Sequence, residues 1–236
     1  MPSLASSATL LSGLSRDLML APWTPFSSAR DVQLTAHTKI ADGADGLAVI
    51  KIEAEVRAPV FEVTRLFRSP EAAQWNTHIA SIDHLGGGMQ LQTYSSPWPF
   101  AWREYLVHCE DEDLEGGGHA SHCRSSEEGH PAAPLRDDRV RGTSETLWRI
   151  APSKEAPQHT TTIHVESLVD PGGGVPKWLV NEVGKRASVT MVTSFIRKAE
   201  MRAETARDGI GCALPELAAA ARNVSPSCAD NKMKQP

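Results

Sequence analysis

The sequence predicts an α+β protein in which one antiparallel sheet packs against a long helix. Three observations lead to this fold class: strand-like segments follow one another at hairpin spacing, short helices stand apart from them, and a long amphipathic segment follows the last strand. Strands that alternated with helices would instead indicate a parallel sheet. Because the long helix must bury its apolar stripe and the sheet is its only large partner, we expect a curved sheet around the helix. A hollow between the two would suit apolar ligands.

The first half of the chain contains short elements. Residues 1–21 are expected to form an N-terminal extension with an amphipathic helix, and the first charge, at Arg16, argues against a secretory signal. The alternative is an organelle-targeting peptide. Segment 33–57 indicates two strands, the second with strict alternation of apolar and polar residues. Pro59 favours the start of a short helix, and a second short helix is expected around residues 71–75.

From residue 79 the pattern returns to strands and ends in one long helix. Strands are expected at 79–85, 89–94, 102–113, 120–125, 139–152 and 159–170. A glycine-rich loop then leads into a helix from Pro176 to about Arg202, with apolar residues at every fourth position. Residues 206–236 lack a clear period and are expected to form a mostly disordered tail, with a short helix at 214–222. The main domain would therefore span residues 22–205.

The composition is that of an ordinary globular chain. The 236 residues carry a formal net charge of −5, and 40% of them are hydrophobic. This mild acidity argues against nucleic acid or an anionic membrane as the main partner, since both need clustered basic charge. The four cysteines include no CxxC pair, and no stretch approaches the roughly 18 apolar residues of a spanning helix. We therefore expect a cytoplasmic protein in a reducing compartment.

Four stretches along the chain carry motifs that occur together in one known family. They are IEAEVRAPVFEVTRLFRSPEAAQWN with Trp75, SSPWPFAWREYLVH with Arg103, Glu104 and Tyr105, EGHPAAPLRDDRVRG with Arg141, and VDPGGGVPKWLVNEVGKRASVTMVTSFIRKAE. In this order they resemble the START domain, the lipid-transfer module related to the steroidogenic acute regulatory and phosphatidylcholine-transfer proteins. The match runs from about residue 22 to residue 203. The chain looks like a single-domain member similar to the phosphatidylcholine-transfer protein.

The resemblance implies a helix-grip fold and a monomer that binds one lipid, without catalysis or cofactors, in an internal hydrophobic tunnel. The long helix would act as a lid, with Gly172, Gly173 and Gly174 as its hinge. The protein would touch membrane surfaces transiently. The residues expected to line the tunnel are Met89, Leu91, Arg103, Tyr105, Trp148, Ile163, Val165, Val183, Ala187, Met191, Val192 and Phe195. Trp75 is expected to anchor the core, and Arg103 to hold a strand end by pairing with an acidic residue.

The identity of the lipid stays open. Sterol-carrying members of the family place an acid and an arginine in the tunnel, and an ungapped count from Arg103 finds Gln90 and Cys109 at those places. The missing charge pair argues against a sterol, which leaves a phospholipid or another lipid.

Other functions are weighed against lipid transfer. An enzyme of the aromatase/cyclase type would share the fold, and Glu104, His108 and Glu110 fall on one strand face. A lipid-sensing interaction module is a further alternative. The spacing from His119 to Cys123 matches no zinc pattern, and the loop before the long helix lacks the GK[ST] ending of a phosphate loop. We therefore expect no catalytic residue and no metal ligand.

Overall fold

The computed structural model describes residues 22–29, 32–41, 46–69, 75–76, 78–96, 100–126 and 128–220, without the side chains of 28–29 and 208–220. Ten strands within these ranges form one sheet in the order β1-β2-β3-β10-β9-β7-β6-β5-β4, with β8 added to β6. The strands are β1 Thr24–Ala29, β2 Leu34–Ile40, β3 Ala48–Val56, β4 Ile79–Gly86, β5 Met89–Tyr94, β6 Trp102–Leu114, β7 Gly118–Ser125, β8 Arg139–Arg141, β9 Thr143–Pro152 and β10 Thr161–Asp170. Every pairing is antiparallel except that of β6 with β8.

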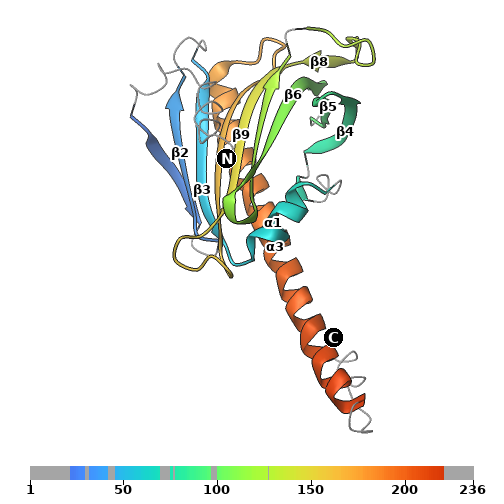
Figure 1. The fold of residues 1–236 in the computed structure, drawn as a ribbon. Helices are drawn as coiled ribbons and strands as arrows, with labels where there is room; N and C mark the ends of the chain where they lie inside the picture. The colour runs from blue at the N-terminus through green and yellow to red at the C-terminus, as the bar shows by residue number, and fades with distance from the viewer. Residues whose placement is uncertain are drawn as a thin grey trace, which may run out of the picture.

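The sheet curves around one long helix (Figure 1). This helix, α3, spans Lys177–Ala220, and a shorter helix, α1, spans Val60–Phe67. Helix α3 packs chiefly on β3, β2 and α1, and its later turns run beyond the sheet. The predicted α+β helix-grip fold is therefore confirmed. No helix in the described part of the chain is long and apolar enough to cross a membrane.

Alternation along the strands decides which face of the sheet meets α3. In β3 the residues from Ala48 to Val56 are buried at every second position, as the period of two predicts. Ile52 lies opposite Val165, and Val165 lies opposite Trp148 on its other side. This row of apolar side chains belongs to the same buried cluster as the inward residues of α3. We call the face that carries it the inner face.

Three element boundaries differ from the sequence-based prediction. Strand β1 was not predicted. The single strand expected at 139–152 is divided at Gly142 into β8, which pairs with β6, and β9, which pairs with β7 and β10. A Cβ on Gly142 would lie only 2.6 Å from both Asp170 O and the Tyr105 ring, so only glycine fits there. Helix α3 continues to Ala220, so the expected end near Arg202 is wrong; alanine, glutamate and arginine favour helix even without an apolar stripe. Residues 1–21, 70–74 and 221–236, where further helices or a tail were predicted, lie outside the described residues.

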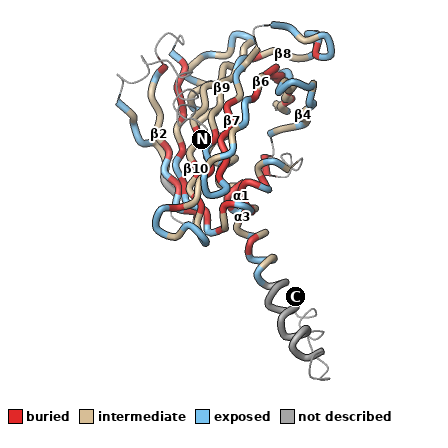
Figure 2. Tube along the Cα trace, in the orientation of Figure 1, coloured by how far each residue is buried: buried red, intermediate tan, exposed pale blue. Residues whose placement is uncertain are grey.

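An aromatic cluster fills one end of the space between the sheet and α3. Phe195 is fully buried, with its ring centre 5.0 Å from that of Trp75, 5.6 Å from that of Trp148 and 6.3 Å from that of Phe67. The buried segments of β3 and α3 converge beside α1 (Figure 2). We call this end of the sheet the core end, and the opposite end, where β10 leads into α3, the hinge end.

A disulfide joins Cys109 of β6 to Cys123 of β7. The two residues lie directly opposite each other in the strand register, on the inner face. The sequence favours a reducing compartment and does not predict this disulfide. Sequence spacing alone does not reveal which cysteines face each other across a sheet.

Removal of the Phe195 ring should destabilise the fold strongly. Phe195→Ala leaves a cavity among three aromatic rings, so we expect the free energy of unfolding to fall by about 3–5 kcal/mol in urea titrations. The matched control is Phe61→Ala, because Phe61 on α1 is 62% exposed and its truncation should cost less than about 0.5 kcal/mol. Equal losses in the two variants would mean that the cluster does not anchor α3.

Candidate functional site

The inner face changes character from the core end to the hinge end. In β10 the inward side chains Ile163 and Val165 are buried, whereas the next two, Ser167 and Val169, are half-buried. Strand β9 shows the same change on moving from Trp148 towards residue 143. The inward side chains at the hinge end therefore stay partly accessible, whereas those at the core end are closed off.

Strand β5 shows the same feature more sharply. Gln90, Gln92 and Tyr94 share the face of Tyr105 and are half-buried, whereas the outward Leu91 and Thr93 are buried. This is the reverse of an ordinary sheet, in which the outward positions are the wet ones. The inward wall of β5 is therefore accessible and polar.

Hydrogen bonds order this polar wall. The Tyr94 hydroxyl donates to Gln92 Oε1 at 3.3 Å, and Gln92 Nε2 donates to Gln90 Oε1 at 3.2 Å. The Tyr94 ring meets the Tyr105 ring edge-on at 5.3 Å between centres. Burial raises the pKa of the Tyr94 phenol above its usual range and that of Tyr105 to about 12. Both phenols are therefore neutral hydrogen-bonding groups near neutral pH.

The structure divides the predicted tunnel residues into groups. Six belong to the core or pack directly on it: Trp148, Ile163, Val165, Met191, Val192 and Phe195. Tyr105 lies in a second cluster nearer the hinge end, with Tyr94, Val107 and Val169 packed around it. Ala187 is half-buried on α3. The core group forms the floor of the accessible region, and the Tyr105 cluster forms part of its wall.

Two of the predicted tunnel residues, Met89 and Leu91, point away from α3. They pack with Leu106 and Ala133 on the outer face, because the register pairs Leu91 with Leu106 and leaves Gln92 beside Tyr105. The prediction for this strand is therefore out of step by one residue, and such a shift moves every side chain of a strand to the opposite face of the sheet.

Val183, also predicted to line the tunnel, is 57% exposed. Apolar residues spaced by four drift about 40° around a helix at each step. Val183 therefore lies on a different side of α3 from Phe195. We leave Met89, Leu91 and Val183 out of the candidate site.

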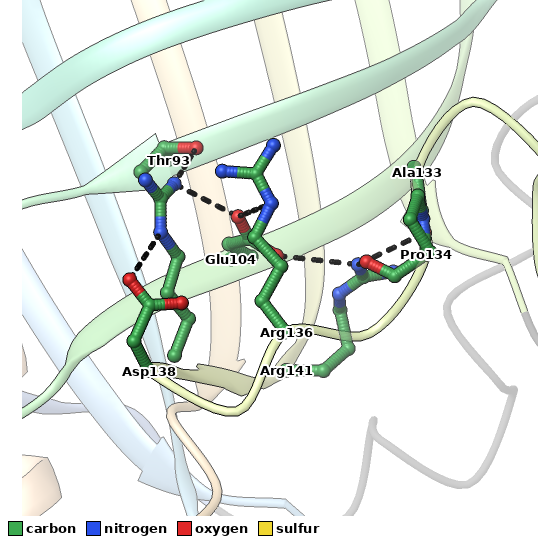
Figure 3. A network of polar contacts seen from close by, with 8 residues as sticks. Thr93, Glu104, Ala133, Pro134, Arg136, Asp138 and Arg141 are labelled. Carbon is green, nitrogen blue, oxygen red and sulfur yellow. Dashed lines mark hydrogen bonds and ion pairs between the residues drawn. The ribbon is translucent and has the colours of Figure 1, made fainter.

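A buried carboxylate braces the outer face behind the site (Figure 3). Glu104 is 1% exposed, and its oxygens lie 2.9 Å from Arg139 Nη1, 3.3 Å from Arg141 Nη2 and 3.9 Å from Arg136 Nε. Arg141 Nη2 also donates to the carbonyls of Ala133 and Pro134. Glu104 thus holds the loop before β8 against β6.

Arg103 lies on the opposite face of β6 and ties the hinge loop to the sheet. Its Nε donates to Pro171 O at 3.0 Å, and its Nη1 donates to Ala101 O. The expected acidic partner is replaced by these two carbonyls. The loop that follows contains Gly172, Gly173 and Gly174 with φ of 64°, 69° and 69°, a backbone conformation that suits glycine.

The pair of residues that suggested a zinc motif is already occupied. Cys123 is bonded to Cys109, and His119 Nδ1 lies 2.9 Å from Arg68 Nη2. Burial lowers the pKa of His119, and the Arg68 charge lowers it further. Nothing in this arrangement leaves a cysteine and a histidine free to bind a metal ion together.

Two surface hollows lie away from the candidate site. One of about 440 Å³ sits on the outer face of β3, β9 and β10, beside Glu53, Arg149 and His164. The other, of about 530 Å³, lies next to α1 at Phe61 and Arg65. Both carry charged side chains, whereas a lipid chain needs a largely apolar lining.

Comparison with known proteins identifies the family. The START domain family model matches residues 17–204. The chain belongs to the START domain family. No curated protein sequence matches it.

Solved structures of other START proteins share the fold. Human STARD10 aligns with a TM-score of 0.69 at 18% identity, over 89% of this chain and 84% of that one. Human StAR-related lipid transfer protein 5 gives 0.66 at 16% identity, over 83% and 94%. A STAR-related lipid transfer protein from Xanthomonas axonopodis gives 0.62 at 19% identity, over 75% and 98%. At these identities the likeness establishes the fold alone.

The polar wall of this START domain was not predicted. The sequence places Gln90 at a tunnel position of the family only by an ungapped count, and Gln92 and Tyr94 are absent from the predicted lining because the apolar Met89 and Leu91 favour the opposite parity. One signal was available: if Tyr105 faces the ligand, the residue paired with it on the neighbouring strand must face the ligand too. That residue is Gln92, but the pairing becomes known only with the register.

Neutralising Glu104 should loosen the outer brace. Glu104→Gln leaves Arg141 without its counter-charge and leaves Arg139 only the exposed Asp138 at 3.7 Å. We expect the free energy of unfolding to fall by about 2–3 kcal/mol, below the full cost for a wholly buried pair because both arginines keep some contact with water. Glu155→Gln, at an exposed position on the β9–β10 loop, is the control and should change stability by less than about 0.5 kcal/mol. Urea titration measures both; an unchanged midpoint in Glu104→Gln would contradict the bracing role.

Proposed function

We propose that this START domain binds a single lipid, as a monomer and without catalysis, between α3 and the hinge-end half of the inner face. It would carry the lipid between membranes or report its presence. The observation that carries this proposal is the reversed burial of β5, where inward Gln92 and Tyr94 are more accessible than outward Leu91 and Thr93. A sheet whose concave side is the accessible one is suited to an internal ligand.

The inner face has an apolar part and a polar part, which suit the hydrocarbon chain and the headgroup of a lipid. The floor carries the half-buried Met191, an adaptable apolar side chain, and Val169 of the Tyr105 cluster adds a second half-buried apolar side chain that could meet a hydrocarbon chain. The wall offers the amides of Gln90 and Gln92 and the phenols of Tyr94 and Tyr105 for a polar headgroup. Burial of the chain would contribute several kcal/mol at about 25 cal/mol per Å² of apolar surface.

Helix α3 is held at the hinge end by contacts that can be exchanged for water. Asn181 accepts a hydrogen bond from Ala48 N at 2.9 Å and donates to Gly46 O at 3.0 Å, and Lys177 pairs with Asp170 at 2.6 Å. Such polar contacts contribute little net stability at a surface. We therefore expect entry and exit of the lipid at this end, with Gly172–Gly174 as the hinge.

Exposed apolar side chains near the same end support transient contact with a membrane. Trp178 lies in the first turn of α3, Trp102 begins β6, and Leu135 lies in the loop before β8; all three are exposed. These elements meet at the hinge end (Figure 1). Tryptophan and leucine are suited to the membrane interface.

The enzyme alternative receives less support. Glu104 is held by arginines, and His108 and Glu110 are half in water on the outer face, away from α3. Among the described residues that line the accessible wall, the polar side chains are amides, hydroxyls, phenols and the Arg103 guanidinium, and burial raises the pKa of both phenols. None of these groups is suited to act as a general base near neutral pH.

A bulky side chain on the lid should block the site. Ala187→Trp places an indole where α3 faces the sheet, so we expect transfer of a fluorescent lipid between vesicles to slow about tenfold or more while the circular dichroism spectrum stays unchanged. The control is Thr190→Trp, because Thr190 is exposed on the same helix and should transfer at the wild-type rate. If the wild-type protein does not accelerate transfer at all, the transfer role fails; if both variants slow equally, the site is misplaced.

A further inference from the structure

Arg103 carries a buried positive charge that the described protein does not neutralise. The residue is 8% exposed, and its hydrogen bonds go to the carbonyls of Pro171 and Ala101. No carboxylate of the described residues forms an ion pair with it. A buried charge without a partner is costly, and buried arginines are normally paired.

The nearby acid is already matched. Asp170 accepts hydrogen bonds from Lys177 Nζ at 2.6 Å and from Gly172 N at 2.9 Å. Burial alone would raise the pKa of Asp170, but Lys177 and the Gly172 amide outweigh it and lower the pKa overall. The Asp170 charge is therefore balanced by Lys177, and the charge of Arg103 remains in excess.

The Nη2 atom of Arg103 lies beside the hinge loop, next to Gly173 and Val140. This atom lies 3.6 Å from the point where a side chain on Gly173 would begin, and nothing lies within 4 Å of the corresponding point on Gly174. Both glycines are exposed, and their amides have no backbone partner among the described residues. These amides lead into the first turn of α3, where the helix dipole favours negative charge.

Tyr105 adds a hydrogen-bond donor on the same side of β6. The Arg103 charge acts on its phenol, and the hydroxyl has no acceptor among the described residues. Within one region the structure thus brings together a guanidinium edge, a neutral phenol and free backbone amides. All three are donors, which is the set that an anionic oxygen group requires.

We propose that Arg103, assisted by Tyr105 and the amides of Gly173 and Gly174, binds the anionic headgroup, a phosphate or carboxylate, of the lipid that this domain carries. This proposal rests on the proposed lipid-binding function and specifies its ligand class. The headgroup would supply the counter-charge that Arg103 lacks. Since the same contact joins β6 to the hinge loop, a bound headgroup would also hold α3 closed.

A role in holding the loop alone does not account for Arg103. The bonds to Pro171 O and Ala101 O explain its Nε and Nη1 atoms, but a neutral donor would make such bonds without the cost of burying a charge. A ligand group bound beside Gly173 would give Nη2 the acceptor that it lacks among the described residues.

The test compares two lipids that differ only in the phosphate. Phosphatidic acid and diacylglycerol with identical acyl chains are presented in neutral vesicles, and the lipid retained by the re-isolated full-length protein is quantified. We expect the wild-type protein to prefer phosphatidic acid. Arg103→Gln should lower retention of phosphatidic acid about tenfold, the loss of one charge-assisted contact, and leave diacylglycerol unchanged. Arg103→Lys should keep most of the preference, because it keeps the charge.

Two controls accompany this test: a variant that removes an exposed positive charge, and the ratio of retained phosphatidic acid to retained diacylglycerol. Lys154→Gln removes the same charge from the exposed β9–β10 loop and should leave both lipids unaffected. The ratio of the two lipids guards against partial unfolding, which would lower both. Equal loss of both lipids in Arg103→Gln, or no loss of phosphatidic acid, would overturn the proposal, as would equal competition by inorganic phosphate alone. If the wild-type protein retains neither lipid, the proposed function itself fails.

Discussion

The packing of Phe195 among Trp75, Trp148 and Phe67 is the contact on which the rest of the molecule depends. It joins the long helix to the sheet at the core end through rings that meet edge-on at 5.0–6.3 Å. Removal of such a ring from a closed apolar cluster costs several kcal/mol. Strong packing therefore holds helix α3 on the sheet at the core end, and weaker contacts hold it at the hinge end.

This asymmetry gives the interior its two regions. At the hinge end α3 is held by Asn181 and by the Lys177–Asp170 pair, contacts that water can replace at low cost. The sheet behind this region is stiffened from its outer face. Glu104 and its arginines supply that rigidity by fastening the loop before β8 to the outer face.

The fold was largely predictable, whereas the site was predictable only in part. Period-two alternation in β3 and the long amphipathic helix depend on local sequence, and both were confirmed. The stripe of every fourth residue correctly placed Phe195 in the interior but wrongly extended to Val183, since it ignored the drift of the stripe around the helix. The inward parity of Leu91 and the pairing of Cys109 with Cys123 depend on register between strands. Register is set by the whole sheet and not by any one segment.

We propose that the accessible inner face binds one lipid. Native mass spectrometry of the full chain, purified from cells without detergent and then incubated with mixed lipid vesicles, tests it most directly. We expect one non-covalent lipid per folded chain, lost when the protein is unfolded. A folded chain that carries no lipid, both before and after the vesicles are added, would contradict the proposal.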